Sequence, residues 1–289
     1  MKALKPSDIG LKSPGFAVAD SHVEHRIIAN VEALEKQGKT FWCLTAQSPI
    51  VHLNLDRGTD GVIQKAMQLG KQIFVAGMPL TDEDRRRHRL PSYSFHKPLL
   101  KPGQSTKDTS YVTSVAERAR ACWKKFKEDY EEALDSEVRT IVIDTGTGSY
   151  ELARYAAFGK LTQVMPLEYA RVNGEFQGLI HRGYDSDKNI LWIHRLKPEW
   201  AEERDGKGNL KSGKTGRLER AGYRDMGFEV QMNLRLAKER DKQGRFHYTT
   251  TVLDCRLNSE IDGLVLKDEM SSFQFLAASV FENDPEEWE

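Results

Sequence analysis

Residues 25–58 constrain the fold more than any other segment, because apolar runs and polar loops alternate there in a fixed order. An apolar, β-branched run at residues 27–31 passes through a short polar loop to Gly38-Lys39-Thr40. An apolar segment at residues 41–46, a break at Pro49 and a second strand-like run at residues 50–55 follow. This order predicts a strand, a loop, a helix and a second strand, which is the local structure of a phosphate-binding unit.

The residues of this unit carry the matching chemistry. Backbone N–H groups of a tight loop at a helix N-terminus form a concave site for a polyphosphate. Lys39 is expected to place its charge at the β- and γ-phosphates, and the Thr40 hydroxyl to ligate Mg²⁺. Gly38 and Phe41 complete the predicted nucleotide-contacting set. The motif is degenerate, because the pattern G-x-x-x-x-G-K-[ST] has glycine where this chain has Ala33, and alanine adopts positive φ less easily.

Residues 208–215 satisfy the full pattern, but in a different context. Residues 199–207 before them are mostly charged and contain no buried strand, and no apolar helix follows. A motif of this kind counts only between a strand and a helix. We therefore expect a mobile surface loop here, and we place the phosphate site at Lys39.

Composition limits the class of protein. At 289 residues, with 39% hydrophobic and 30% charged residues, the chain has room for one large α/β domain or two small ones. It has no apolar run approaching the roughly 20 residues that span a bilayer and no secretory signal, so we expect a cytoplasmic protein with no membrane partner. The net charge is zero, so any affinity for nucleic acid must come from local patches. Three isolated cysteines predict reduced core thiols rather than a zinc site or disulfides.

The remaining pattern predicts an α/β fold with a mostly parallel sheet, because strand-like and helix-like segments alternate. We expect an irregular arm at residues 1–23 and an exposed, proline-rich insertion at residues 77–109. Further expected elements are helices at residues 58–69 and 110–137, strands at 71–76, 139–145 and 189–194, a glycine-rich loop and helix within 146–187, a charged loop at 197–224, a hairpin of 227–239 with 245–256, a strand at 264–267, a helix at 271–278 and a mobile acidic tail.

Two polar residues end predicted central strands. Asp144 closes the run at residues 139–145, and the carboxyl ends of parallel strands are where α/β sheets place ligands. We expect Asp144 to hold Mg²⁺ beside Thr40, although a strand-end aspartate is more often a simple cap. His194 closes the run at residues 189–194 and either hydrogen-bonds the γ-phosphate or is an ordinary half-buried histidine.

Taken together, these motifs resemble the RecA-like P-loop ATPases, and among them the compact phage-encoded RecA-core ATPases linked to single-strand annealing and recombination. The resemblance covers roughly residues 24–265, so the expected domains are the arm at 1–23, an ATPase domain at 24–267, and a helix and acidic tail at 268–289. It rests on Gly38-Lys39-Thr40, the strand ending at Asp56, the strand ending at Asp144, the strand ending at His194, and the terminal hairpin ending at Arg256. It implies a RecA-like core with helices on both sheet faces and a C-terminal antiparallel hairpin.

The resemblance also implies roles for individual residues. Asp56 stands where the family carries the acid that polarises the attacking water, typically a glutamate in the recombinase branch. His194 stands at the polar sensor position. Arg256, or Lys238 and Arg240 on the preceding strand, corresponds to a residue that faces a neighbouring subunit and stabilises the transferring phosphoryl group.

In the same family, the loops after the Asp144 and His194 strands touch DNA. Here they are residues 146–173 and 197–224. Aromatic side chains at Tyr150, Tyr155, Phe158 and Tyr169 either stack on bases or pack in the core, and Tyr223 in the second loop is expected to stack on bases. The cations expected to contact DNA phosphates are Lys207, Lys211, Lys214, Arg217, Arg220 and Arg224.

Three functions are compatible with this sequence. The first is an ATPase that uses ATP and Mg²⁺ and acts on single-stranded DNA in phage-type recombination, annealing or repair. It would work as a homo-oligomeric ring or filament in the bacterial host cytoplasm. Its possible partners are single-strand-binding or replication proteins. The second is a helicase-like or loader motor that acts on nucleic acid or on a partner protein. The third, motivated by Ala33 and the short Asp56, is a degenerate nucleotide-binding subunit with a structural or assembly role.

Overall fold

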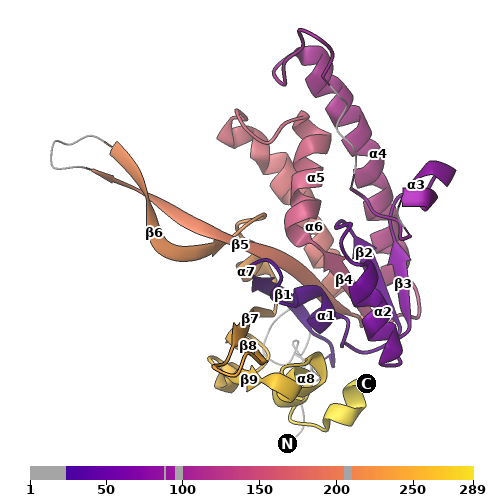
Figure 1. The fold of residues 1–289 in the computed structure, drawn as a ribbon, viewed down its shortest axis with the longest axis vertical. Coiled ribbons are helices and arrows are strands. Elements are labelled where there is room, and N and C mark those ends of the chain that lie inside the picture. Colours follow the sequence, from indigo (N-terminus) through magenta and orange to yellow (C-terminus); the bar gives the residue numbers. More distant parts are fainter. Residues whose placement is uncertain (1–23, 88, 95–99, 205–209) are drawn as a thin grey trace, which may run out of the picture.

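A mixed sheet forms the centre of the molecule (Figure 1). The computed structural model describes residues 24–87, 89–94, 100–204 and 210–289. The strands lie in the order β3-β2-β4-β5-β1-β7-β8-β9, and β6 pairs only with β5. The strands β3, β2, β4, β5, β1 and β7 all pair in parallel with their neighbours in this order. Strand β8 runs antiparallel to β7, and β9 runs antiparallel to β8. The strand bounds are β1 Ile28–Ala33, β2 Ile50–Asn54, β3 Ile73–Ala76, β4 Thr140–Asp144, β5 Asn189–Arg204, β6 Leu210–Arg220, β7 Met232–Arg240, β8 Phe246–Cys255 and β9 Val265–Lys267.

Helices connect the parallel strands, as parallel pairing requires. The predicted α/β architecture, with a mostly parallel sheet and an antiparallel hairpin near its end, is confirmed. In the described part of the chain, no helix is both long enough and apolar enough to cross a bilayer. The helix bounds are α1 Lys39–Cys43, α2 Asp60–Gln68, α3 Asp82–Arg87, α4 Thr109–Leu134, α5 Gly146–Phe158, α6 Tyr169–Tyr184, α7 Met226–Glu229 and α8 Phe273–Phe281, with short 3₁₀ turns at Pro166–Glu168, Ser259–Ile261, Asp268–Met270 and Pro285–Trp288.

The two faces of the sheet bury separate apolar clusters. Ile190 and Trp192 of β5 pack with residues of α4, α5 and α6, whereas Leu191 and Ile193 pack with residues of α1, α2 and α8. Successive side chains of a strand point to opposite faces, so odd and even positions of β5 serve different clusters. We call these sides the α5 face and the α1 face, and every residue of a central strand belongs to one of them.

Several predicted elements are present close to their expected positions. The helix predicted at residues 110–137 is α4, and the hairpin predicted near the end is β7 with β8. The cysteine prediction is also confirmed, because Cys43, Cys122 and Cys255 are buried free thiols.

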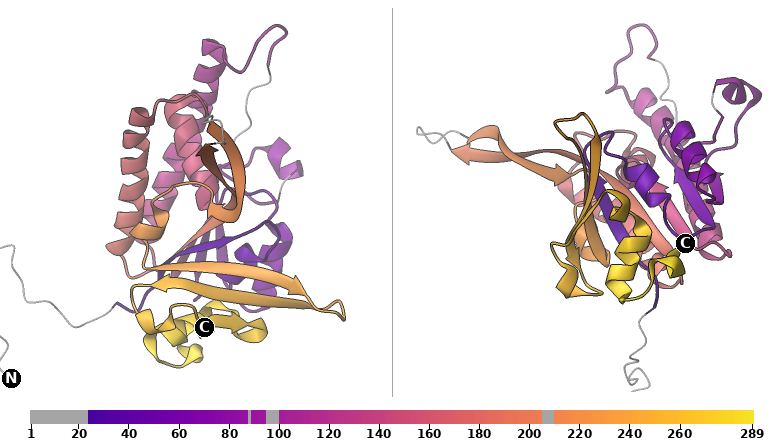
Figure 2. Two further views of the ribbon diagram at one scale, coloured as in Figure 1. Left: turned by 90° about the vertical axis from the view of Figure 1, so that its left-hand side faces the viewer. Right: turned by 60° about the horizontal axis from the view of Figure 1, so that its bottom comes forward.

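Two predicted loops are wrong. Residues 146–158 form helix α5 directly after β4, and Thr145 caps this helix by accepting a hydrogen bond from Gly148 N at 2.9 Å. Gly146, one of the glycines that suggested a loop, leaves room for a neighbouring side chain, because a Cβ there would lie 2.6 Å from the ring of His194. The charged segment after residue 196 is a β-hairpin of β5 with β6 that projects from the body (Figure 2). Strands exposed on both faces need no apolar alternation, so composition alone could not identify them.

The predicted insertion at residues 77–109 is partly buried and not wholly exposed, and the predicted mobile tail packs on the body. Tyr93, within the predicted insertion, is fully buried, and its hydroxyl donates to Asp129 at 2.5 Å. In the tail, Trp288 is buried and stacks on Phe281 with ring centroids 5.1 Å apart. The prediction of a mobile C-terminus is therefore wrong, because one tryptophan supplies enough apolar surface to fix the last turn.

Replacing Trp288 tests this packing. We expect Trp288→Ala to lower the free energy of unfolding by about 3–5 kcal/mol, because it removes a large side chain that is only 3% exposed. Trp200→Ala is the matched control, since Trp200 is 57% exposed, and should cost less than about 1 kcal/mol. Urea denaturation followed by circular dichroism measures both. Equal losses for the two variants would contradict an ordered tail.

Candidate functional site

The loop between β1 and α1 has the shape that its glycine permits. Strand β1 ends at Ala33 and α1 begins at Lys39, with Gly38 at its N-cap in the left-handed region at φ 85°. A Cβ at Gly38 would also lie 3.6 Å from the ring of Tyr248 on β8. The position therefore favours glycine because of its backbone conformation, and the predicted order of strand, loop and helix is present here.

Lys39 points into this loop. Its Nζ donates to the carbonyl oxygens of Ala33 at 3.0 Å and Leu34 at 2.7 Å. Burial lowers the pKa of Lys39, the charge of Asp144 opposes this shift, and the charge of Arg195 adds to it. The ammonium group is therefore held where a further negative charge, such as a phosphate, would stabilise it.

Thr40 and Asp144 are in direct contact. The Thr40 Oγ1 donates to Asp144 Oδ2 at 2.7 Å, although the two residues lie 104 positions apart in the chain. Asp144 ends β4, whereas Thr40 lies in α1, the helix after β1, and in the sheet β5 lies between β1 and β4. The loop before α1 thus reaches across the carboxyl end of β5, and the structure brings together the hydroxyl and the carboxylate that the sequence singled out.

These two side chains fit a magnesium ion. Mg²⁺ prefers oxygen ligands and is usually held by one or two carboxylates together with substrate phosphates, rather than by a cage of protein groups. Thr40 and Asp144 offer a hydroxyl and a carboxylate side by side. The described residues contain no cluster of three or more His, Cys, Asp or Glu side chains that could hold a metal.

A cavity adjoins the loop. It has a volume of about 310 Å³, and Gly38, Phe41 and Tyr248 lie in its wall with Gln37 and Asp268. Aromatic walls with a few polar groups suit a planar, polar ligand. The predicted contact residue Phe41 therefore lies at the mouth of a site large enough for a nucleobase.

Asp56 lies beside an arginine that sequence reasoning missed. Asp56 follows β2, its side chain is half exposed, and its Oδ2 lies 4.0 Å from a terminal nitrogen of Arg195. Arg195 pairs in register with Ala33 at the start of the loop, and its charge reaches Lys39. The signal that could have found it is strand alternation: Leu191 and Ile193 face α1, so position 195 does too, whereas position 194 does not.

His194 lies on the α5 face, away from the side that carries Lys39. It is fully buried, and its Nδ1 lies 3.3 Å from Trp192 O. Burial, assisted by the charge of Arg220, lowers the pKa of His194 to about 3. The structure thus packs this histidine under α5 and does not bring it together with Thr40 and Asp144.

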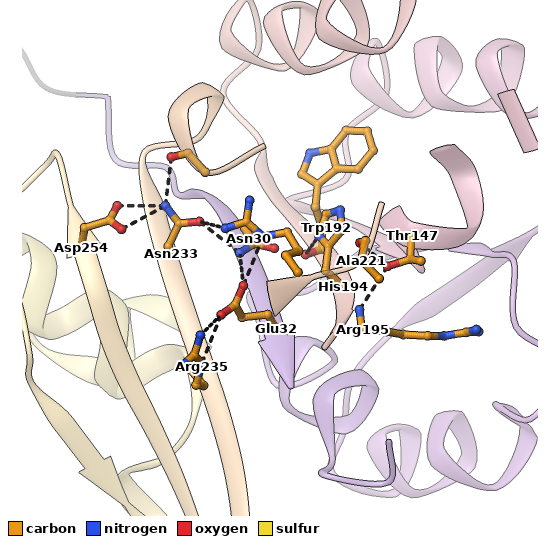
Figure 3. A network of polar contacts seen from close by, with 12 residues as sticks. Asn30, Glu32, Thr147, Trp192, His194, Arg195, Ala221, Asn233, Arg235 and Asp254 are labelled. Atoms are coloured by element: carbon orange, nitrogen blue, oxygen red, sulfur yellow. Dashed lines mark hydrogen bonds and ion pairs between the residues drawn. The ribbon is translucent and has the colours of Figure 1, made fainter. Parts of the chain in front are cut away.

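Glu32 anchors the root of the projecting hairpin (Figure 3). Its buried carboxylate accepts from Arg235 Nη2 at 2.6 Å and from Arg220 Nε at 3.1 Å. Arg220, the last residue of β6, also donates to Asn233 Oδ1 at 3.1 Å. A second tie lies nearby, where Thr147 Oγ1 donates to Ala221 O at 2.8 Å. Arg220, one of the predicted DNA contacts, is therefore engaged within the chain.

The other predicted DNA contacts within the described residues lie on β6 or shortly after it. Lys214, Arg217 and Arg224 are exposed, and Lys214 Nζ lies 5.7 Å from the ring centroid of Trp200. Lys207 lies outside the described residues, as does the side chain of Lys211.

The predicted aromatic contacts are mostly internal. Tyr150 and Tyr223 are buried, and both pack on Phe176 with centroids 5.4 and 5.3 Å away. Phe158 meets Tyr169 edge-on at 5.6 Å. Tyr155 is partly buried against the same cluster. The packing alternative therefore holds for Tyr150, and the prediction that Tyr223 stacks on bases is wrong because its ring is buried in this cluster.

The candidates for a residue acting on a neighbouring subunit lie at opposite ends of the hairpin β7–β8. Arg256 follows β8 and donates to Phe228 O on α7, far along the strand from Tyr248. Lys238 is close to the loop, because its backbone N donates to the Gln37 side chain. The cations of Lys238 and Arg240 lie 3.8 and 4.8 Å from the ring centroid of Phe246.

No protein-family model matches this sequence, and no curated protein matches it significantly. The geometry of these residues is therefore what any functional proposal has to rest on.

The buried His194 should make stability depend on pH. Its folded pKa, about 3, lies below the ordinary value of 6.5, so between these values the unfolded chain binds one more proton than the folded chain. We expect its contribution to stability, complete above pH 6.5, to fall by up to about 1.4 kcal/mol per pH unit as the pH drops toward 3.

Urea denaturation of the wild type and of His194→Asn between about pH 4.5 and 7 measures this pH dependence of the free energy of unfolding. The variant should show the shallower dependence, whereas His181→Asn, which removes a histidine whose side chain is 57% exposed, should keep the wild-type slope. A wild-type slope in His194→Asn would contradict the assignment.

Proposed function

We propose that this chain is an ATP-binding and ATP-hydrolysing protein with a RecA-like core that acts on single-stranded DNA in recombination, annealing or repair. The observation that carries the proposal is the 2.7 Å hydrogen bond from Thr40 to Asp144, with Lys39 in the same loop. A cation and a hydroxyl from the start of α1 meet a carboxylate from the end of β4 there, and this is the set that a magnesium-bound triphosphate requires.

The proposed nucleotide extends from the loop into the adjoining cavity. Lys39 would exchange its contacts with the Ala33 and Leu34 carbonyl oxygens for the β- and γ-phosphates. Mg²⁺, held through Thr40 and Asp144, would neutralise phosphate charge during transfer. The base would enter the cavity between Phe41 and Tyr248, where the Asp268 carboxylate can accept from an exocyclic amine.

Hydrolysis would use the groups beside the loop. Asp56 would orient the attacking water, and its half-exposed position leaves it accessible. Arg195, 4.0 Å from Asp56 and close enough to influence Lys39, would supply positive charge as the phosphoryl group transfers. In a ring or filament, Lys238 or Arg240 of an adjacent subunit could add to it, and either is better placed than Arg256 because β7 ends near the loop.

The hairpin is the proposed DNA-contacting element. It projects from the body (Figure 2). It exposes Lys214 and Arg217 together with the ring of Trp200, a combination that suits phosphate contacts and base stacking. Its root is tied to Glu32, one residue before the loop-terminal Ala33. This connection favours a DNA-responsive ATPase over one that ignores nucleic acid.

Lys39→Ala is expected to weaken binding of a fluorescent ATP analogue at least tenfold, because it removes the ammonium group that donates to the loop carbonyl oxygens and is proposed to bind the phosphates. Lys214→Ala is the matched control, since it removes the lysine of the second glycine motif. Lys214 lies in strand β6. This control variant should leave nucleotide affinity unchanged in the absence of DNA. Equal affinity for the wild type and Lys39→Ala would overturn the proposed site, and loss in Lys214→Ala alone would move it to the second motif.

ATP turnover is expected to rise when single-stranded DNA is added, and DNA affinity to fall steeply with salt. The double variant Lys214→Ala/Arg217→Ala should reduce the slope of log affinity against log salt by about 1.4, because two phosphate contacts are removed. Turnover in a coupled assay and fluorescence anisotropy with labelled oligonucleotides measure these effects.

The same experiments separate the alternatives. Turnover indifferent to DNA would contradict the DNA role, and strand displacement without annealing would favour a helicase-like motor. ATP binding without any turnover in the wild type would leave the structural or assembly subunit. Retained binding with lost turnover in Asp56→Asn would support the role of Asp56 in hydrolysis.

A further inference from the structure

A buried histidine contacts the same carboxylate oxygen of the proposed magnesium ligand Asp144 that Thr40 contacts. We propose that His52 is a positioning residue that holds the Asp144 carboxylate in the orientation that binds magnesium. The inference rests on the proposed function, because it assumes that Asp144 faces a magnesium-bound nucleotide. It goes beyond that function by assigning a role to a residue in the interior of β2.

The placement of His52 follows from strand pairing. Strands β2 and β4 are parallel neighbours, with His52 opposite Val142 and Asn54 opposite Asp144. Side chains two residues apart share a face, so His52 and Asp144 both point to the α1 face and meet diagonally. The His52 Nε2 lies 3.2 Å from Asp144 Oδ2, and both side chains are almost completely buried.

The direction of this hydrogen bond assigns the tautomer. A carboxylate oxygen accepts, so Nε2 of His52 carries the hydrogen and donates it. The other ring nitrogen, Nδ1, has no partner among the described groups. The imidazole therefore makes one directional contact, and Asp144 receives it.

Both donors converge on the same oxygen of Asp144. Thr40 Oγ1 at 2.7 Å and His52 Nε2 at 3.2 Å both reach Oδ2, and within the described chain no side-chain donor is recorded for Oδ1. Two donors, one from α1 and one from β2, fix the rotation of the carboxylate. They leave Oδ1 to the metal or to a water bound to it.

The surroundings of His52 argue against an incidental histidine. Ile50 and Val142, on the same face of the sheet, are fully buried apolar residues. A polar ring in such a position costs free energy unless its hydrogen bond compensates. Groups that orient a metal ligand in this way typically change metal affinity by about 10–100-fold when removed.

A pair of amide variants separates orientation from polarity. Glutamine can place its amide nitrogen where Nε2 of histidine lies, whereas the amide of asparagine falls short, near Nδ1. We therefore expect His52→Asn to raise the Mg²⁺ concentration at half-maximal binding of a fluorescent ADP analogue by about 10–100-fold. His52→Gln should restore it to within about threefold of the wild type, and His181→Asn, at an exposed position, should not change it.

The outcomes distinguish this inference from the proposed function. If the full-length wild type binds the analogue only weakly with or without Mg²⁺, the proposed function fails. If the wild type binds in a magnesium-dependent way and His52→Asn has the same Mg²⁺ midpoint, only the role of His52 fails. A midpoint equally raised in His52→Gln and His52→Asn would also overturn it, because the position would then need only its original shape.

A measurement without metal or nucleotide covers variants that fold poorly. The urea midpoints of wild type, His52→Leu, Asp144→Asn and the double variant form a cycle that isolates the contact. We expect the midpoint shift of the double variant to be clearly smaller than the sum of the two single shifts. Additive shifts would show that the two side chains do not interact and would overturn the proposal.

Discussion

The hydrogen bond between Thr40 and Asp144 is the contact on which the candidate site depends. It joins a helix start to a strand end across an intervening strand, and both partners are largely withdrawn from water. In such a low-dielectric setting a charge-assisted hydrogen bond is strong and an unpaired carboxylate is costly. Because Asp144 is tied at Oδ2, the loop that holds Lys39 keeps a defined position over the sheet edge, and the adjoining cavity keeps its wall.

The pleat of the sheet divides the polar groups between two faces. The α1 face carries the groups that suit a polyphosphate, namely Lys39, Thr40 and Asp144, with His52 behind them. The α5 face carries Glu32 and His194, which contact the root of the hairpin. Ligand chemistry and mechanical anchoring thus occupy opposite sides of the same strands.

Sequence patterns identified what depends on short-range periodicity. The strand, loop and helix around Gly38, the amphipathic helix α4 and the terminal hairpin were predictable because their apolar spacing matches their geometry. Arg195 was missed because naming a strand end does not say which face it presents. Helix α5 was missed because glycine in its first turn suggested a loop. Gly146 leaves room for the His194 ring, and this reason is visible only once β5 and α5 are placed.

Two of the contacts at the root of the β5–β6 hairpin involve consecutive residues, Arg220 and Ala221. One is the ion pair of Arg220 with Glu32, and the other is the bond from Thr147 to Ala221. Thr147 belongs to the first turn after Asp144, and Glu32 immediately precedes Ala33. A force on the projecting hairpin would therefore act on the backbone at two segments beside the proposed triphosphate site, the end of β1 and the start of α5.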